Sequence, residues 1–293
     1  MIYVLENDTL RVEIDSFGAE LKSVKRKSDD KEYMWYADKK YWGRTSPVLF
    51  PFVGNCRNKE YRYGGKTYAI GQHGFARDME HTMESRTEDT IWFSLHSNEE
   101  TMEKYPFAFV LKIGYNLTGN ELKVMWKVEN PDTKTLYFSI GAHPAFLCPF
   151  NGEENKLGYG LQFAGLKEVH HHGNTPDTGL AVMSEDIVIP LEDEKVYFTP
   201  GFFDRCTYMV EGKQTGEVSL VTPDGKPYVT MDFDAPLFAI WSPEGKDAPF
   251  VCIEPWYGRC DADDFEGTLE ERAYENAVEP EQAFEASYSI RYL

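Results

Sequence analysis

The chain has 293 residues, of which 42% are hydrophobic and 27% are charged, a composition typical of a globular protein with a sizeable core. Its formal net charge of −19 argues against a nucleic-acid partner, which requires clustered Lys and Arg, and against binding to an anionic membrane surface. No apolar run reaches the ~18 residues of a membrane-spanning helix, and the N-terminus lacks the basic segment of a signal peptide. The five cysteines are scattered without a Cys-x-x-Cys pair, which indicates reduced thiols in a cytoplasmic protein.

The hydrophobic pattern along the chain is mainly that of β-strands. Gly64-Gly65, between two tyrosine-rich runs, predicts a hairpin, because glycine supplies the positive φ of a two-residue turn. A single helical turn is expected at residues 99–105. Apolar and polar residues then alternate over 109–115 and 122–128, which predicts strands with one buried face. A short helix is expected at 268–273, where the sequence allows a capping box.

Many short strands, Gly and Pro turns and very little helix predict an all-β fold, one large antiparallel β-sandwich. No linker, change in composition or internal repeat divides the chain. Residues 1–293 are therefore expected to form a single domain.

Two polar loops interrupt the strands in the first third of the chain. Arg57 closes a Gly-containing segment, and its five donors suit a hydroxyl or a carboxylate, although a surface arginine fits equally well. His73 lies between Gly71 and Gly74, which let the backbone approach a ligand closely, and Arg77 follows four residues later. The alternative for His73 is a loop histidine that is hydrogen-bonded to a carbonyl.

Three further candidates lie at strand ends. His143 precedes a proline, which imposes an extended geometry on it. The alternative to a functional role for His143 is a histidine packed in the core. Asp204 precedes a strand, a position that is typical of an ordinary turn aspartate. Glu254 ends the apolar run Phe250–Ile253, where a carboxylate is costly unless it is paired or acts as a base with a raised pKa.

Other chemistries find little support in the sequence. His170-His171-His172 has no nearby pattern that completes a ligand set, so we interpret it as a polar loop and expect no metal site. The chain has no Gly-x-Ser-x-Gly elbow, P-loop or Gly-x-Gly-x-x-Gly motif. The remaining set of His, Glu, Arg, Asp and aromatic residues suits acid–base chemistry on a hydroxylated molecule.

In their order along the chain these motifs resemble the aldose 1-epimerase (galactose mutarotase) family, and within it the LacX-type bacterial branch. Residues 41–54 are similar to the entry motif of the branch, and Gln72–Asp78 to its first His motif. Gly141–Phe146 is similar to the His-Pro motif, with Ala142 in place of an Asn, and Cys252–Gly258 to the motif that carries the base. The resemblance spans essentially the whole chain.

The resemblance implies a β-supersandwich that interconverts the α and β anomers of a free hexose. It implies that Glu254 takes the proton of the C1 hydroxyl and that His143 donates a proton to the ring oxygen; the ring opens, the C1–C2 bond rotates and the ring closes. Four residues are expected to bind the sugar: His73, Arg57, Asp204 and Arg77. Proton transfer demands no metal and no cofactor, and the chain is expected to be a monomer or a homodimer whose partner is a small sugar.

Three alternatives stay open. A hexose-6-phosphate 1-epimerase is a close rival, since Arg44, Arg57 and Arg77 could form a phosphate pocket. A non-catalytic carbohydrate-binding protein would keep the pocket but would need no acid–base pair. A hydrolase or lyase is less well supported, because hydrolysis usually needs two carboxylates on one bond and only Glu254 is convincingly placed.

Overall fold

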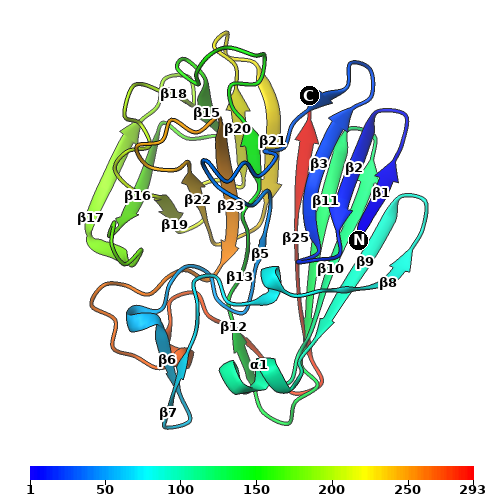
Figure 1. Cartoon of the computed structure of the whole chain (residues 1–293). Coiled ribbons are helices and arrows are strands. Elements are labelled where there is room, and N and C mark those ends of the chain that lie inside the picture. The colour runs from blue at the N-terminus through cyan, green and yellow to red at the C-terminus, as the bar shows by residue number, and fades with distance from the viewer.

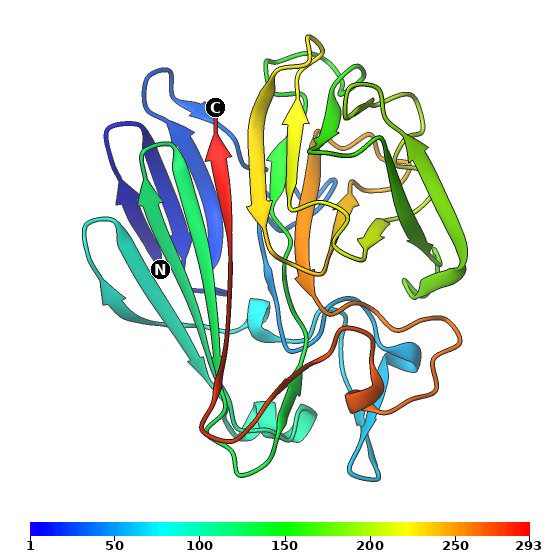
Figure 2. The same ribbon diagram turned by 180° about the vertical axis from the view of Figure 1, so that it is seen from behind.

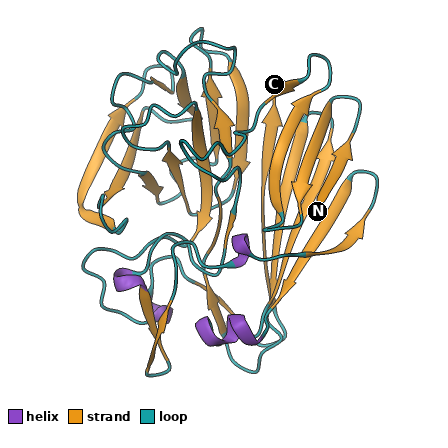
Figure 3. Ribbon diagram, in the orientation of Figure 1, coloured by secondary structure: helices purple, strands orange, loops and turns teal.

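The structure, a computed structural model, describes residues 1–293. It contains twenty-five strands, β1–β25, in five antiparallel sheets, and one helix, α1 (Glu99–Lys104). Three single 3-10 turns complete the regular structure: η1 (Arg57–Lys59), η2 (Ala76–Asp78) and η3 (Leu269–Glu271). No helix is long and apolar enough to cross a membrane. The predicted all-β antiparallel fold with very little helix is thus confirmed (Figure 3).

The largest sheet has nine strands, and the C-terminal strand lies in its middle. The last strand β25 pairs with β11 on one side and with β21 on the other, so it joins the two halves of the molecule (Figures 1 and 2). In sheet order the strands are β18 (Lys195–Tyr197), β15 (Gly160–Phe163), β20 (Glu217–Val221), β21 (Pro227–Phe233), β25 (Ala283–Tyr292), β11 (Glu121–Glu129), β10 (Val110–Thr118), β9 (Thr90–His96) and β8 (Thr82–Arg86).

The second sheet has eight strands, and its centre carries the apolar run that ends in Glu254. This run forms β23, which lies between β22 on one side and β13 and β14 on the other. The strands are β17 (Ala181–Pro190), β16 (Glu168–Asn174), β19 (Tyr208–Glu211), β22 (Leu237–Trp241), β23 (Phe250–Tyr257), β13 (Ile140–Ala142), β5 (Val48–Leu49) and, paired with β23 alone, β14 (Ala145–Leu147).

Three small sheets complete the fold. The predicted Gly64-Gly65 hairpin is confirmed, since both glycines have positive φ and join β6 to β7. The hairpin and α1 lie at the lower end of the molecule in Figure 1. The strands are β1 (Ile2–Glu6), β2 (Leu10–Asp15), β3 (Glu20–Arg26) and β4 (Lys31–Glu32) in one sheet, β6 (Glu60–Tyr63) and β7 (Lys66–Ala69) in another, and β12 (Leu136–Phe138) and β24 (Asn276–Val278) in the last.

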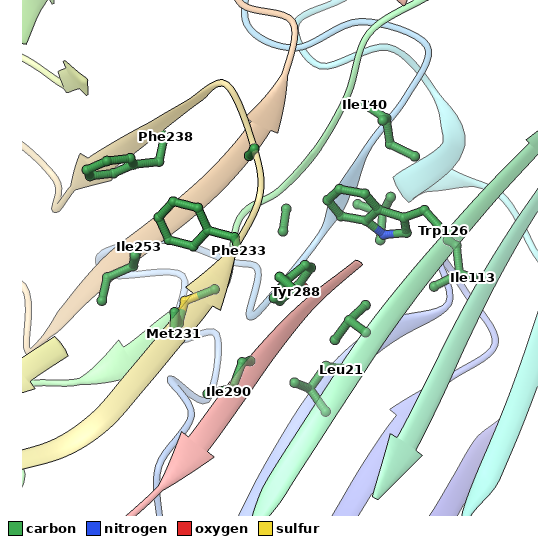
Figure 4. Packing of buried hydrophobic residues seen from close by; sticks show 14 of the residues in the cluster. Leu21, Ile113, Trp126, Ile140, Met231, Phe233, Phe238, Ile253, Tyr288 and Ile290 are labelled. Atoms are coloured by element: carbon green, nitrogen blue, oxygen red, sulfur yellow. The ribbon is translucent and has the colours of Figure 1, made fainter. Parts of the chain in front are cut away.

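A single cluster of 60 buried residues runs from Leu5 to Tyr292 and fills the space between the sheets. Trp126 of β11 and Tyr288 of β25 pack edge to face at its centre, with ring centroids 5.3 Å apart (Figure 4). Ile253 of β23 reaches the same core. The single domain over residues 1–293 stays a prediction, and this continuous core is the feature that supports it.

The helix expected at 268–273 is wrong in extent. The Glu271 carboxylate accepts from the Thr268 backbone N–H at 2.7 Å, so the predicted cap forms, but only one 3-10 turn follows. The buried Arg272 then donates to Asp261 at 2.7 Å and to Glu275 at 3.0 Å. Arg272 has a ψ of 145°, outside the helical region, and the chain turns at residues 273–274. The ion pairs hold Arg272 in this position, and one turn of helix has too few backbone hydrogen bonds to resist them.

The prediction of a loop at residues 170–172 is also wrong, because the three histidines lie in β16. His171 is 2% exposed and packs against Tyr208, with ring centroids 4.5 Å apart. His170 and His172 point to the other face, where His170 Nδ1 lies 2.8 Å from Asp186. The sequence shows no apolar–polar alternation here, because the buried position of the strand is occupied by His171 and not by an apolar residue.

Candidate active site

Glu254 projects from β23 away from the main core. Because side chains alternate along a strand, Cys252, Glu254 and Trp256 share one face, while Ile253 enters the core on the other. The Glu254 side chain is only 1% exposed, and its Oε2 atom has no hydrogen-bond partner. Burial therefore raises the pKa of Glu254 well above its ordinary value, while the indole N–H of Trp256 acts in the opposite direction.

A gap in the sheet opens directly beside Glu254. On one side of β23, β14 pairs with residues 250–252 and β13 with residues 256–257, so neither strand covers residues 253–255. His143 and Pro144 span this gap, and His143 Nδ1 lies 3.3 Å from Glu254 Oε1. Pro255, which has no N–H to donate, lies at the same interruption. The break in strand pairing thus makes room for an imidazole against the carboxylate.

Two tryptophans fix the ring of His143. Trp42 stacks on it, with ring centroids 4.6 Å apart and an interplanar angle of 26°, and Trp241 meets it edge-on at 5.3 Å. The Trp42 carbonyl accepts from the Trp35 indole N–H at 2.9 Å, which anchors the segment that carries Trp42. Because an indole face attracts cations, this stack favours a histidine that carries a proton during part of a reaction cycle.

Burial shifts the pKa values of His143 and Glu254 in opposite directions. Burial and the positive charges of Arg77 and Arg44 lower the pKa of His143 to about 3, whereas burial raises the pKa of Glu254. Both pKa shifts favour a protonated Glu254 carboxyl group beside a neutral His143 imidazole. A proton on His143 in place of Glu254 gives the alternative form, carboxylate and imidazolium, without a change in net charge.

His73 lies at the edge of the same site, with its ring centroid 5.7 Å from that of His143. Its Nδ1 accepts from the Gly54 backbone N–H at 3.0 Å, which places the proton of the neutral ring on Nε2 as a free donor. Burial and the charge of Arg77 hold the pKa of His73 well below its usual value. Gly74 is required here, because its φ is +67° and a Cβ would lie 2.3 Å from the Phe50 carbonyl oxygen.

Arg77 follows on the turn η2 and also reaches the site. Its Nη2 donates to the Gln72 carbonyl at 2.8 Å, and its buried Nε has no hydrogen-bond partner. Arg44 is held by Asp78 at 2.7 Å, and the same carboxylate lies 3.8 Å from Arg77 Nε. Burial and the neighbouring Arg44 lower the pKa of Arg77 to about 10, so the guanidinium stays charged at neutral pH.

The structure places Arg57 outside this pocket. The Arg57 guanidinium donates to the Phe265 carbonyl at 3.1 Å and lies 3.2 Å from the exposed Glu266 carboxylate. Its backbone N–H donates to Asp261 at 2.8 Å. These bonds turn the side chain away from Glu254 and into a neighbouring surface groove.

Asp204 also lies outside the pocket. It borders a separate cavity of about 280 Å³, and its Oδ1 accepts from the Gly245 backbone N–H at 3.0 Å. The residue before this glycine, Glu244, lines the pocket of Glu254. Asp204 therefore supports a loop of the site without facing its interior.

The pocket above Glu254 has a volume of about 440 Å³, a size suited to a small molecule. Its walls combine Trp42, Trp241 and Trp256 with polar side chains. The sequence had not singled out these lining residues: Trp42, Trp241, Asn55, Asn174, Asp177, Thr178 and Glu244. Nor had it singled out Cys252, which lies beside Glu254 and His143. The only available signal was local: Trp42 stands in the entry motif, and Cys252 precedes Glu254 by two residues on the same strand face. The rest come from loops that the fold alone brings together.

Comparisons with known proteins show which family the chain belongs to. The family model described as aldose 1-epimerase matches residues 1–261, a range that includes Glu254, His143, His73 and Arg77. The chromosomal protein LacX of Lactococcus lactis subsp. lactis is 31% identical over 300 residues that cover 100% of both chains.

Solved structures show the same architecture. A galactose mutarotase related enzyme from Lactobacillus acidophilus superposes with a TM-score of 0.94 at 37% identity, and covers 100% of this chain and 97% of that one. A galactose mutarotase-like protein from Lactobacillus casei gives a TM-score of 0.91 at 29% identity, with 100% of both chains covered. These likenesses confirm the predicted galactose mutarotase-like fold and the resemblance read from the motifs. The chain therefore belongs to the aldose 1-epimerase family.

Proposed function

We propose that this protein is an aldose 1-epimerase that interconverts the α and β anomers of a free hexose. One observation carries the proposal: Glu254 Oε1 and His143 Nδ1 lie 3.3 Å apart, both buried, on the floor of a polar pocket with aromatic walls. Membership of the aldose 1-epimerase family supports the same reaction class.

In the proposed reaction Glu254 and His143 exchange protons with the two oxygens attached to C1. Glu254 in its carboxylate form removes the proton of the C1 hydroxyl while the His143 imidazolium protonates the ring oxygen, and the C1–ring oxygen bond breaks. Rotation about C1–C2 and the reverse proton transfers close either anomer. The cycle consumes no proton, so a pair that shares one proton suits it. Each proton-transfer group is worth about 10²–10⁴-fold in rate.

The polar wall supplies donors and acceptors for the other hydroxyl groups. His73 offers its Nε2–H and Arg77 its guanidinium, both fixed by the backbone of the 72–78 loop. We propose these two as sugar-binding residues. Arg57 and Asp204 are left out of the proposed contacts because their side chains are engaged elsewhere.

The arrangement of charge favours a free sugar over a hexose 6-phosphate. Of the three arginines that suggested a phosphate pocket, only Arg77 lines the site. Arg44 is paired with Asp78 at 2.7 Å, and Arg57 points into another groove. A phosphate would also meet Glu244 and Asp177, which line the pocket and repel it.

The test is mutarotation of freshly dissolved α-glucose and α-galactose, followed by polarimetry or NMR exchange. The wild-type chain is expected to speed equilibration over buffer, and Glu254→Gln is expected to lower kcat about 10²–10⁴-fold. Glu266→Gln is a matched control, because this glutamate is exposed and lies outside the pocket. Its activity should equal that of the wild type.

Two results would favour other functions. Faster turnover of glucose 6-phosphate than of glucose would identify a sugar-phosphate epimerase. Hexose binding in calorimetry without any acceleration would identify a non-catalytic carbohydrate-binding protein. Full activity in Glu254→Gln would refute the role of Glu254 as the base.

Several predictions about the setting of the protein rest on composition. The five cysteines are all free and buried, which supports a reducing cytoplasm. The lack of nucleic-acid and membrane partners, which the acidic composition favours, stays a prediction. The monomeric or homodimeric state also stays a prediction.

A further inference from the structure

Three side chains that ligate transition metals meet beside the pocket, and two of them, His143 and Glu254, line it. One donor atom each of His143, Cys252 and Glu254 lies within 4.8 Å of the other two, and all three residues are buried. The sequence pointed to no metal site, because Cys252 has no ligand neighbour in the chain except Glu254. The third donor comes from a segment more than a hundred residues earlier.

The fold holds these donors rigidly. Cys252 and Glu254 project from the same face of β23. The strands that flank His143 are fixed to β23 on either side, through the pairs Gly141↔Trp256 and Ala145↔Cys252. Backbone pairing of these strands and the Trp42 stack therefore fix the His143 imidazole next to Cys252 and Glu254. Such a site needs little ordering when a ligand binds.

Two atoms of the cluster lack partners. Glu254 Oε2 and His143 Nδ1 are both buried without a hydrogen bond, and a buried polar atom that is left unsatisfied is costly. The proposed sugar reaction employs Glu254 and His143 but gives Cys252 no part. A ligand that engages all three is an electrophile that accepts sulfur, nitrogen and oxygen together.

We propose that His143, Cys252 and Glu254 form a binding site for a thiophilic divalent cation of the Zn²⁺ class, which competes with the hexose for the same two proton-transfer groups. Zn²⁺ accepts Cys, His and carboxylate ligands in tetrahedral geometry, whereas Mg²⁺ and Ca²⁺ require oxygen ligands. Three protein ligands leave a fourth tetrahedral position for water or another ligand. On binding, the Cys252 thiol proton and the carboxyl proton of Glu254 pass to solvent, which leaves thiolate, imidazole and carboxylate as ligands.

Metal binding itself is independent of the proposed epimerase activity, and only the competition with hexose rests on it. A rival site lies on the surface, where His170 Nδ1 is 2.8 Å from Asp186 and His170 Nε2 is 3.4 Å from Glu168. That cluster offers nitrogen and oxygen but no sulfur, so a probe that reports a metal–thiolate bond separates the two.

The experiment titrates Co²⁺ into the reduced full-length chain and follows the thiolate-to-cobalt charge-transfer absorption. The wild type is expected to show the band, and Zn²⁺ is expected to displace Co²⁺ and abolish it. Cys252→Ser should lose the band and weaken metal binding by more than about 100-fold, since even outer partners of a metal site are worth 10–100-fold. Cys260→Ser should retain it, because Cys260 lines the same pocket but its thiol contacts Met209.

Thermal denaturation of each variant shows that it is folded before its spectrum is compared. The absence of the band at saturating Co²⁺, or a band that persists in Cys252→Ser, would overturn the metal site. If the band forms but excess hexose leaves it unchanged, the competition is refuted and the metal site stands. If hexose turnover is absent while the band forms and depends on Cys252, the epimerase proposal fails and the metal site again stands.

Discussion

Glu254 should make the stability of this protein fall as pH rises, the opposite of the effect of a paired surface carboxylate. Its native pKa lies above the ~4.3 of an unfolded chain, so the folded state binds more protons between these two values. The stability contributed by this group is complete below pH ~4.3. It is then lost by about 1.4 kcal/mol per pH unit until the native pKa is reached.

His143 has the opposite dependence and a separate window. Its pKa falls to about 3 in the native state from 6.5, so its contribution is complete above pH 6.5 and is lost as pH falls toward 3. Between pH ~4.3 and 6.5 the two slopes oppose each other. Above pH 6.5 the His143 contribution is constant, and the effect of Glu254 can be isolated.

The perturbation is Glu254→Gln, which keeps the shape of a protonated carboxyl group but cannot ionise. Urea denaturation of the wild type and the variant at pH 6.5, 7.5 and 8.5 gives the difference in unfolding free energy. This difference should shift in favour of the variant by about 1.4 kcal/mol per pH unit, hence about 2.7 kcal/mol over two units as long as the native pKa of Glu254 lies above that range.

Other titrating groups cancel in this comparison. Glu275, whose pKa burial raises to about 7, and the buried thiols are present in both proteins. A difference that stays constant from pH 6.5 to 8.5 would mean that Glu254 is already ionised in the folded protein at pH 6.5. The reasoning from burial would then be refuted.

Three further variants test single contacts. Trp42→Leu removes the aromatic face that stacks on the His143 imidazolium, an interaction worth about 2 kcal/mol when desolvated. The variant should lower kcat roughly 30-fold in polarimetry and shift the acid limb of the pH profile of kcat to lower pH. Trp42→Phe should recover part of the loss, and an unchanged pH profile in Trp42→Leu would contradict the role of the stack. Gly74→Ala should lose far more stability in urea denaturation than Gly64→Ala. Both positions have positive φ, which costs a non-glycine residue about 1–2 kcal/mol, but only a Cβ at residue 74 would collide with backbone atoms. Equal losses in the two variants would contradict this reasoning. Arg57→Ala should leave kcat/KM unchanged and cost less than about 1 kcal/mol in unfolding free energy, since its ion pair is exposed, and a large rise in KM would show that the side chain enters the pocket.

The sequence predicts the strands and the strand-end histidines because these depend on local pattern. Alternation over 109–115 and 122–128 corresponds to β10 and β11, and the apolar run before Glu254 corresponds to a strand buried on both faces. His143 stands before a proline at the end of a short strand. In each case the residues that determine the structure are neighbours in the chain.

Side-chain direction depends on distant residues and escapes such reasoning. Arg57 turns away from the pocket because the Phe265 carbonyl and Glu266, about 200 positions later, accept its hydrogen bonds. Asp204 is drawn to the Gly245 backbone by a loop that no local pattern specifies. The stack of Trp42 on His143 likewise joins segments a hundred residues apart.

The most direct test of the central proposal is a crystal structure of the chain with a bound hexose. We expect the sugar to occupy the pocket lined by Trp42 and Arg77, with its C1 hydroxyl hydrogen-bonded to Glu254 and its ring oxygen within reach of His143. A hexose that binds with C1 directed away from this pair, or that occupies the separate cavity beside Asp204, would contradict it.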